Sequence, residues 1–225
     1  MKIRNGFVSN SSSSSFIVFF PHEIKTIEEL DKFIIPENDQ ERFKKDNSWY
    51  FKVEERIKKT YQSFINESRT LDMSFEEFRN KAIDYVFKDI QEQGPNNYFK
   101  AFESWFGYGF YLDENNVLHA DDFEFKNMDE LKDAIDMCKY LEKEKENFNW
   151  EIQNAEEEYD ELDSECAKYE NLKEVGKLLN DIDNNLNESE VFYSFHYCDE
   201  EGLFWSLMEH GGIFGNLEGF KESHH

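Results

Sequence analysis

Carboxylates are the residues of this chain whose number and spacing most strongly indicate a binding function. Between Glu151 and Glu165 the chain carries eight acidic side chains and neither lysine nor arginine. Carboxylates at this density attract basic protein surfaces and repel nucleic acid and anionic membrane. We therefore expect a host or phage protein with a basic surface as the partner, and neither direct nucleic-acid nor membrane binding. The candidate partner-binding residues are Glu151, Glu156, Glu157, Glu158, Asp160, Glu161, Asp163 and Glu165.

The negative charge is concentrated in the second half of the chain. Residues 1–100 hold 16 Lys and Arg against 17 Asp and Glu, whereas residues 101–225 hold 9 against 33. Two interpretations of the acidic stretch stay open. It is either the solvated face of a helical arm, or a docking surface whose carboxylates occupy the positions that phosphates would take on a nucleic-acid-binding protein. Both interpretations place the carboxylates on the surface.

A second group of residues has the types found in zinc sites. His196, Cys198, Glu209 and His210 lie close together in the sequence, and zinc is held by about four N, S or O ligands in a tetrahedron. His196 and Cys198 would share one face of a strand, but Glu209 and His210 are successive residues that would point apart. We therefore expect no metal and no cofactor. No nucleophile-elbow, P-loop, zinc-protease or dinucleotide motif occurs in the sequence, which favours a non-enzymatic protein.

The first twenty residues, MKIRNGFVSNSSSSSFIVFF, place the polar run Ser9–Ser15 between two apolar pieces. Serines supply turns and caps through short side-chain hydrogen bonds to the backbone. Hydroxyls beside Lys2 and Arg4 could instead bind a phosphate or be phosphorylated, or another protein could recognise the whole segment. We expect the apolar flanks to be anchored in the core and the serines to be displayed at the surface, as a turn or loop before the first strand.

Residues 4–18, RNGFVSNSSSSSFIV, resemble an amino-terminal signature of the form K-x-R-x-G-F-V-[ST]-N-S-S-S-S-S-F. This signature recurs on otherwise diverse, uncharacterised proteins of bacteriophages and bacteria, and the match covers under a tenth of the chain. The resemblance implies a phage or mobile-element origin but no activity. The residues that carry the signature are Lys2, Arg4, Gly6, Phe7, Ser9, Asn10, Ser11, Ser12, Ser13, Ser14, Ser15 and Phe16.

Charge and resemblance together predict a phage-type accessory protein that acts by protein–protein binding and interferes with host defence or nucleic-acid machinery. The alternative is a small-ligand or nucleotide-binding protein that uses the amino-terminal Lys/Arg/Ser segment and an aromatic sheet. The cysteines Cys138, Cys166 and Cys198 are sparse and form no CxxC pair, which favours a reducing cytoplasm. No apolar run approaches the roughly 20 residues that a membrane span needs.

The hydrophobic pattern predicts an α+β fold: a small antiparallel or mixed sheet with covering helices and a long acidic helical insertion, a coiled-coil hairpin. The apolar run FIVFF before Pro21 is typical of a strand buried on both faces. Capping boxes at Thr26 and Ser74 predict two helix starts, and Gly94 predicts the end of the second helix. Closely spaced aromatic residues predict two hairpins. The sheet is therefore expected to combine residues 16–20, 106–120 and 191–208.

A heptad pattern of apolar residues, with steps of four and three from Phe148 to Tyr169, lies inside the insertion. One helix over residues 129–187 would be roughly 88 Å long at 1.5 Å per residue, which is too long to pack on a domain of this size. We therefore expect the insertion to fold back somewhere in 147–176, and an intermolecular coiled coil is the alternative. The side chains expected to be buried by the fold-back are Phe148, Ile152, Tyr159 and Leu162.

The candidate breaks in this insertion are the Asn147–Asn149 stretch and Gly176. The domain organisation that follows is a single α+β domain formed by residues 1–128 and 188–223, interrupted by the acidic insertion at 129–187. The terminal pair, residues 224–225, resembles the remnant of a purification tag and is left out of the metal argument.

Overall fold

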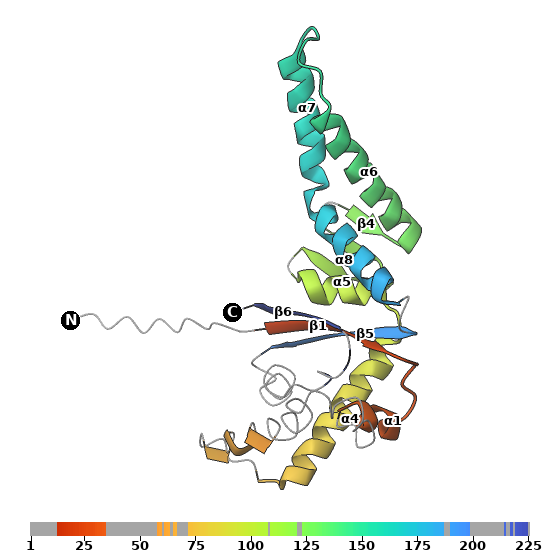
Figure 1. Ribbon diagram of the computed structural model, residues 1–225, viewed down its shortest axis with the longest axis vertical. Helices are drawn as coiled ribbons and strands as arrows, with labels where there is room; N and C mark the ends of the chain where they lie inside the picture. Colours follow the sequence, from red (N-terminus) through yellow and green to blue (C-terminus); the bar gives the residue numbers. More distant parts are fainter. Residues whose placement is uncertain are drawn as a thin grey trace, which may run out of the picture. The chain divides into compact units, whose positions relative to one another are not determined.

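The chain forms two compact units, residues 1–97 with 189–225 and residues 98–188. Figure 1 shows the course of the chain through both. The computed structural model describes residues 13–34, 58–59, 61–63, 65–66, 72–107, 109–120, 123–186, 190–198, 214, 217 and 219–224.

The first unit is built on an antiparallel sheet in which β1 (Ser13–Phe20) lies between β5 (Val191–Cys198) and β6 (Gly219–His224). Phe16 to Phe20, the predicted buried strand, are all at most 7% exposed. An unbroken apolar run is favourable here because both faces of a middle strand are covered. β6 has no counterpart among the predicted strands, and the predicted strand at 203–208 lies outside the described residues.

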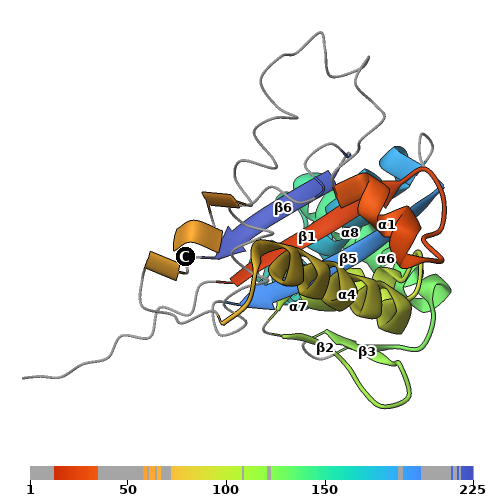
Figure 2. The same cartoon turned by 90° about the horizontal axis from the view of Figure 1, so that it is seen from below.

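Helices α1 (Ile27–Ile34) and α4 (Phe75–Gln93) cover one face of this sheet, as Figure 2 shows. α4 begins at the predicted capping box: Glu77 N donates to Ser74 Oγ at 3.3 Å and Ser74 N donates to Glu77 Oε2 at 2.7 Å. It ends at Gly94, whose φ of 74° an L-residue rarely adopts. The core under these helices contains Phe16, Val18, Phe20, Leu30, Phe78, Ala82, Ile83, Val86, Ile90, Tyr193 and Phe195.

The serines nearest the first strand lie inside the sheet and not in a displayed loop. Ser14 and Ser15 are fully buried in β1, opposite Tyr197 and His196 of β5. The prediction of surface display is therefore wrong for these two residues, and Ser9–Ser12 lie outside the described residues. The reason is pairing: β5 is eight residues long, and a partner strand of equal length must include the serines to satisfy its backbone groups.

Two segments of the first unit, one before and one after the second unit in the sequence, are hydrogen-bonded to each other. Asn96 N donates to the Phe192 carbonyl at 3.0 Å, and Phe192 N donates to Asn96 Oδ1 at 2.9 Å. The second unit begins at Tyr98 rather than at residue 129, so it is longer than the insertion predicted from the heptads. The predicted hairpin near residue 110 belongs to this unit and not to the sheet of the first.

The small sheet of the second unit has the described strands β2 (Phe110–Leu112), β3 (Leu118–Ala120) and β4 (Phe123–Phe125), in that order and antiparallel. The prediction of one combined sheet is thus wrong. Helix α5 (Tyr98–Phe106), which the pattern did not predict, precedes β2. The turn between β2 and β3 is held by Asp113, which accepts hydrogen bonds from the backbone N–H groups of Asn115 and Val117 at 2.8 and 2.9 Å.

The rest of the second unit is an arm of three helices, α6 (Met128–Glu146), α7 (Ala155–Lys168) and α8 (Glu170–Leu186). The arm folds back through residues 147–154, inside the predicted interval, and α7 returns beside α6 (Figure 1). Gly176 is not a break. It lies within α8, where an added Cβ would be 3.0 Å from Ile135 Cγ2, so glycine permits close packing of α8 on α6.

Burial is uneven along the arm. α6 and α8 bury apolar side chains, but no residue of α7 is buried. Phe148, Tyr159 and Leu162 are half-buried, and Ile152 is 36% exposed in the turn. The expectation that these four are buried is therefore wrong. Phe148 and Ile152 lie in the reversal between the two helices, and Tyr159 and Leu162 lie on α7, which buries none of its residues. None of the described helices is long and apolar enough to cross a membrane.

Candidate partner-binding surface

Helix α7 carries most of the candidate binding residues. Its first turn contains Glu156, Glu157 and Glu158, and its last turn contains Lys168, an order that suits the helix dipole. The helix begins after Asn154, which has a φ of 62° and caps no backbone N–H group with its side chain. Negative charge at the amino end thus supports a helix start that lacks a side-chain cap. It also places carboxylates next to the turn.

The eight predicted carboxylates fall into three sets. Asp163 forms an ion pair with Lys145 of α6, and Glu165 forms one with Lys168. Hydrogen bonds to these carboxylates raise the pKa of both lysines. Glu151 is exposed in the turn. The other five are exposed and form no ion pair with any described residue; we call them the α7 carboxylates, and they are Glu156, Glu157, Glu158, Asp160 and Glu161.

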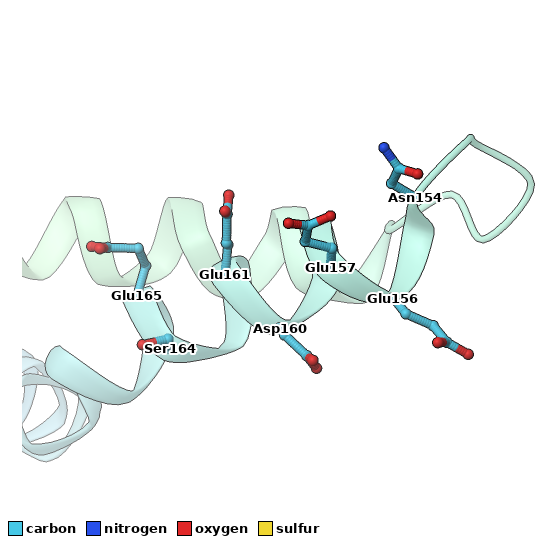
Figure 3. A pocket seen from close by; sticks show the side chains of 7 residues that line it. All are labelled: Asn154, Glu156, Glu157, Asp160, Glu161, Ser164 and Glu165. Atoms are coloured by element: carbon cyan, nitrogen blue, oxygen red, sulfur yellow. The ribbon is translucent and has the colours of Figure 1, made fainter.

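Figure 3 shows how part of this surface is arranged. Glu157 and Glu161 extend from one side of α7, and Glu156 and Asp160 extend from the other. Side chains four residues apart lie on the same side of a helix, so each pair concentrates like charge at neighbouring positions. Like charges at this spacing destabilise an isolated helix slightly, and a cationic partner would relieve that repulsion. A hollow along α7 is lined by Asn154, Glu156, Glu157, Asp160, Glu161, Ser164 and Glu165.

An aromatic cluster lies at the end of the arm, where the chain reverses. We call Phe148, Trp150 and Tyr159 the aromatic tip. The ring centroid of Trp150 is 4.6 Å from that of Tyr159 and 5.2 Å from that of Phe148. Trp150 is nevertheless 59% exposed. The heptad pattern includes Phe148 and Tyr159 but predicts burial for them, so no pattern in the sequence indicates that an aromatic surface forms here.

The two described cysteines of the arm come from different helices, Cys138 from α6 and Cys166 from α7. Cys138 and Cys166 line a hollow together with the Lys145–Asp163 and Lys173–Glu142 ion pairs. Cys138 Sγ lies 3.4 Å from the Tyr169 carbonyl, to which it donates. Burial raises the pKa of the Cys138 thiol, and the nearby Glu142 carboxylate adds to the effect. A thiol that is harder to ionise is a poor nucleophile, which argues against a catalytic cysteine here.

The zinc-type residues are not brought together among the residues that the structure describes. His196 is exposed on β5, where its Nδ1 lies 3.0 Å from Ser15 Oγ. Glu209 and His210 lie outside the described residues. Within the described ranges there is also no other group of three or more His, Cys, Asp or Glu side chains that could hold a metal ion. The Ser15–His196 contact joins two neighbouring strands, and Ser15 is too buried to meet a substrate.

The described part of the amino-terminal signature is the beginning of β1. The signature residues from Lys2 to Ser12 lie outside the described residues, and Ser13 to Phe16 form the start of β1. Ser14 and Ser15, which the nucleotide-binding alternative would use, are fully buried. The described part of the signature therefore contributes to the sheet.

His119, in the small sheet of the second unit, is not among the candidate residues predicted from the sequence. His119 stacks on Tyr111 with ring centroids 4.6 Å apart. Its two ring nitrogens each lie 3.6 Å from a carboxylate oxygen, one of Asp113 and one of Glu124. Hydrogen bonds from the turn, led by that of Val117, lower the pKa of Asp113. These contacts connect β2, β3 and β4, and the residues that make them all lie between positions 111 and 124.

Comparison with known proteins identifies no relative, so the functional conclusion rests on the geometry of the arm. No protein-family model matches the chain, and neither a curated protein nor a solved structure shows significant similarity to it.

Proposed function

We propose that this protein is a non-enzymatic binding protein whose helical arm presents the α7 carboxylates to a basic surface of another protein. One observation carries the proposal: α7 has five exposed carboxylates that pair with no described cation, on a helix that buries none of its residues. The helix dipole accounts for the negative charge in the first turn of α7, but not for Asp160 and Glu161 further along the helix. Repulsion between neighbouring carboxylates opposes this charge density, so a role outside the folded chain accounts for it better.

The distribution of the remaining charge supports the same proposal. Several lysines of the arm are already paired within the chain, Lys145 with Asp163, Lys168 with Glu165 and Lys173 with Glu142. The α7 carboxylates are therefore left without nearby compensation among the described residues. An uncompensated acidic surface attracts a basic protein over several ångströms and raises its association rate.

The accessory role implied by the amino-terminal resemblance is consistent with such a surface. A partner that normally holds nucleic acid would offer a basic surface of the required kind, and the arm would then occupy positions that phosphates otherwise contact. With such a partner, the protein would act by interfering with host defence or nucleic-acid machinery.

The proposal is tested by measuring binding of a labelled Arg/Lys-rich peptide across a salt series. Neutralising the α7 carboxylates to Gln and Asn should weaken binding about tenfold or more at low salt and flatten its salt dependence. A matched variant should lose less than about threefold, because it removes the same charge from exposed positions of the first unit. The positions neutralised in that control are Glu28, Asp72, Glu76, Asp84 and Glu92.

Equal losses in the two variants would show that only net charge matters, and the arm would then have no special role. Circular dichroism of both variants should show the helix content of the wild type, since all of the altered side chains are exposed and each first-turn carboxylate supports its helix by only about 0.3–1 kcal/mol.

A further inference from the structure

The aromatic tip has a geometry suited to receiving a ligand side chain. Trp150 is held by Tyr159 on one side, with rings inclined at 37°, and by Phe148 at 73°. More than half of Trp150 is still exposed. A tryptophan already restrained by two neighbouring rings loses little conformational freedom when a partner covers it. This is the kind of residue that dominates the affinity of a protein interface.

The tip already binds one cation of its own chain. Lys145 Nζ lies 5.9 Å from the ring centroid of Tyr159 and forms an ion pair with Asp163. An aromatic face combined with a carboxylate is an arrangement that holds an ammonium or a guanidinium group. Trp150 also has an exposed acidic neighbour, because Glu151 follows it in the turn.

We propose that Trp150 is the anchor of the partner interface and receives an arginine side chain of the basic partner. The guanidinium stacks on the indole face while surrounding basic residues pair with the α7 carboxylates. Arginine is favoured over lysine because its planar group stacks on aromatic rings and is less strongly hydrated. Tryptophan gives the strongest cation–π attraction of the aromatic side chains. This inference rests on the proposed function, since it names the contact by which the acidic arm recognises its partner.

The test compares two peptides of equal length and charge, one alternating arginine with glycine and one alternating lysine with glycine. Binding of each to the full-length protein is measured by fluorescence anisotropy at low salt. The wild-type protein should bind the arginine peptide more tightly. Trp150→Ala should weaken binding of the arginine peptide about 2- to 30-fold, the range of a cation–π contact, and remove the preference for arginine.

Two further variants make the result specific. Trp150→Leu keeps an apolar side chain without a π face, and it should lose as much affinity as Trp150→Ala. Tyr140→Ala removes a ring of similar exposure, 56%, from α6 and should change affinity less than about twofold. Full affinity in Trp150→Leu would overturn the cation–π contact in favour of simple apolar packing. An equal loss in Tyr140→Ala would overturn the assignment of the anchor to the tip.

The same experiment separates this inference from the proposed function. If neutralising the α7 carboxylates weakens both peptides while Trp150→Ala weakens neither, the arm binds basic partners without the anchor, and the inference is wrong. If neutralisation changes nothing, the proposed function itself is wrong. The Trp150 variants lose two ring contacts at a largely exposed site, so their stability should fall by only about 0.5–1.5 kcal/mol and they should stay folded at the assay temperature. A thermal unfolding curve of each variant checks that the loss of affinity is not a loss of fold.

Discussion

Strand β1 and helix α7 lie at opposite extremes of burial. From Ser14 to Phe20 every side chain of β1 is at most 7% exposed, whereas α7 buries no residue over its 14 positions. β1 pairs with a strand along each edge, and its side chains at Phe16, Val18 and Phe20 belong to the core of the first unit. α7 contacts the rest of the arm along one side, so most of its surface is available to a partner. β1 therefore belongs to the part of the molecule that stabilises the fold, and α7 belongs to the part that we propose binds a partner.

The comparison also shows that polarity does not decide position in this protein. Serines occupy the buried end of β1, and a tryptophan lies in the open at the end of the arm. Hydroxyls can be buried when the strand that carries them is fully paired, since the backbone groups are then satisfied. Trp150 is assigned to binding because it lies in a cluster of three aromatic rings beside exposed carboxylates, and not because of its exposure alone.

The largest effect is expected for truncation in the sheet core. Phe20 is fully buried, with its ring centroid 5.4 Å from those of Phe33 and Phe214 and 5.5 Å from that of Tyr193. Phe20→Ala should lower the free energy of unfolding by about 3–5 kcal/mol. Ile152→Ala at the exposed turn should cost under about 1 kcal/mol. Urea denaturation followed by circular dichroism measures both, and similar costs would break the comparison between the two regions.

A glycine substitution in the same sheet is expected to have the next largest effect. An added Cβ at Gly219 would lie 2.5 Å from the Ile17 carbonyl oxygen, which belongs to the backbone and cannot move alone. Gly219→Ala should therefore cost about 1–3 kcal/mol and loosen β6 from β1. Hydrogen exchange should become faster at the β1 and β6 amides that pair, while the arm amides stay protected. Unchanged exchange in β6 would show that the sheet accommodates the methyl group.

The two buried serines should respond to alanine with opposite signs. Ser14 Oγ is buried and has no hydrogen-bond partner among the described residues, so Ser14→Ala should raise stability by about 1 kcal/mol. Ser15→Ala should lower it by about 0.5–1.5 kcal/mol, because the hydrogen bond to His196 is lost. Thermal unfolding measures both. A double-mutant cycle of Ser15→Ala with His196→Ala should give a coupling energy; additive effects would rule out the bond as the cause.

The smallest effect concerns a helix cap and depends on pH. The pKa of Glu77 is lowered below its ordinary value of 4.5, mainly by the hydrogen bond from the Ser74 backbone and then by that from the Ser74 side chain. A lowered folded-state pKa adds stability that is fully present above pH 4.5 and is lost as the pH falls through the folded value. The difference in stability between wild type and Glu77→Gln should therefore shrink between neutral pH and pH 3. A constant difference would remove the ionised cap as the cause.

Local sequence signals were sufficient for several elements. The capping boxes at Thr26 and Ser74 and the stop at Gly94 are where the pattern predicts them, because a cap is formed by residues three or four positions apart. The FIVFF run is a buried strand for a similar reason. The α+β class and the fold-back of the arm within 147–176 followed from periodicity and length. The exposure of the α7 carboxylates could also be predicted, since charge in a helix without paired lysines is favourable only in solvent.

Other features were decided by segments far apart in the chain. Ser14 and Ser15 are buried because β5, some 180 positions later, pairs along their whole strand. The hairpin near residue 110 forms a sheet of its own because it pairs with β4 rather than with β1. Trp150 is exposed, and joined to Tyr159, because the reversal of the arm happens to place both at its end. A residue's own type sets what burial costs, but only tertiary pairing determines which segment covers it.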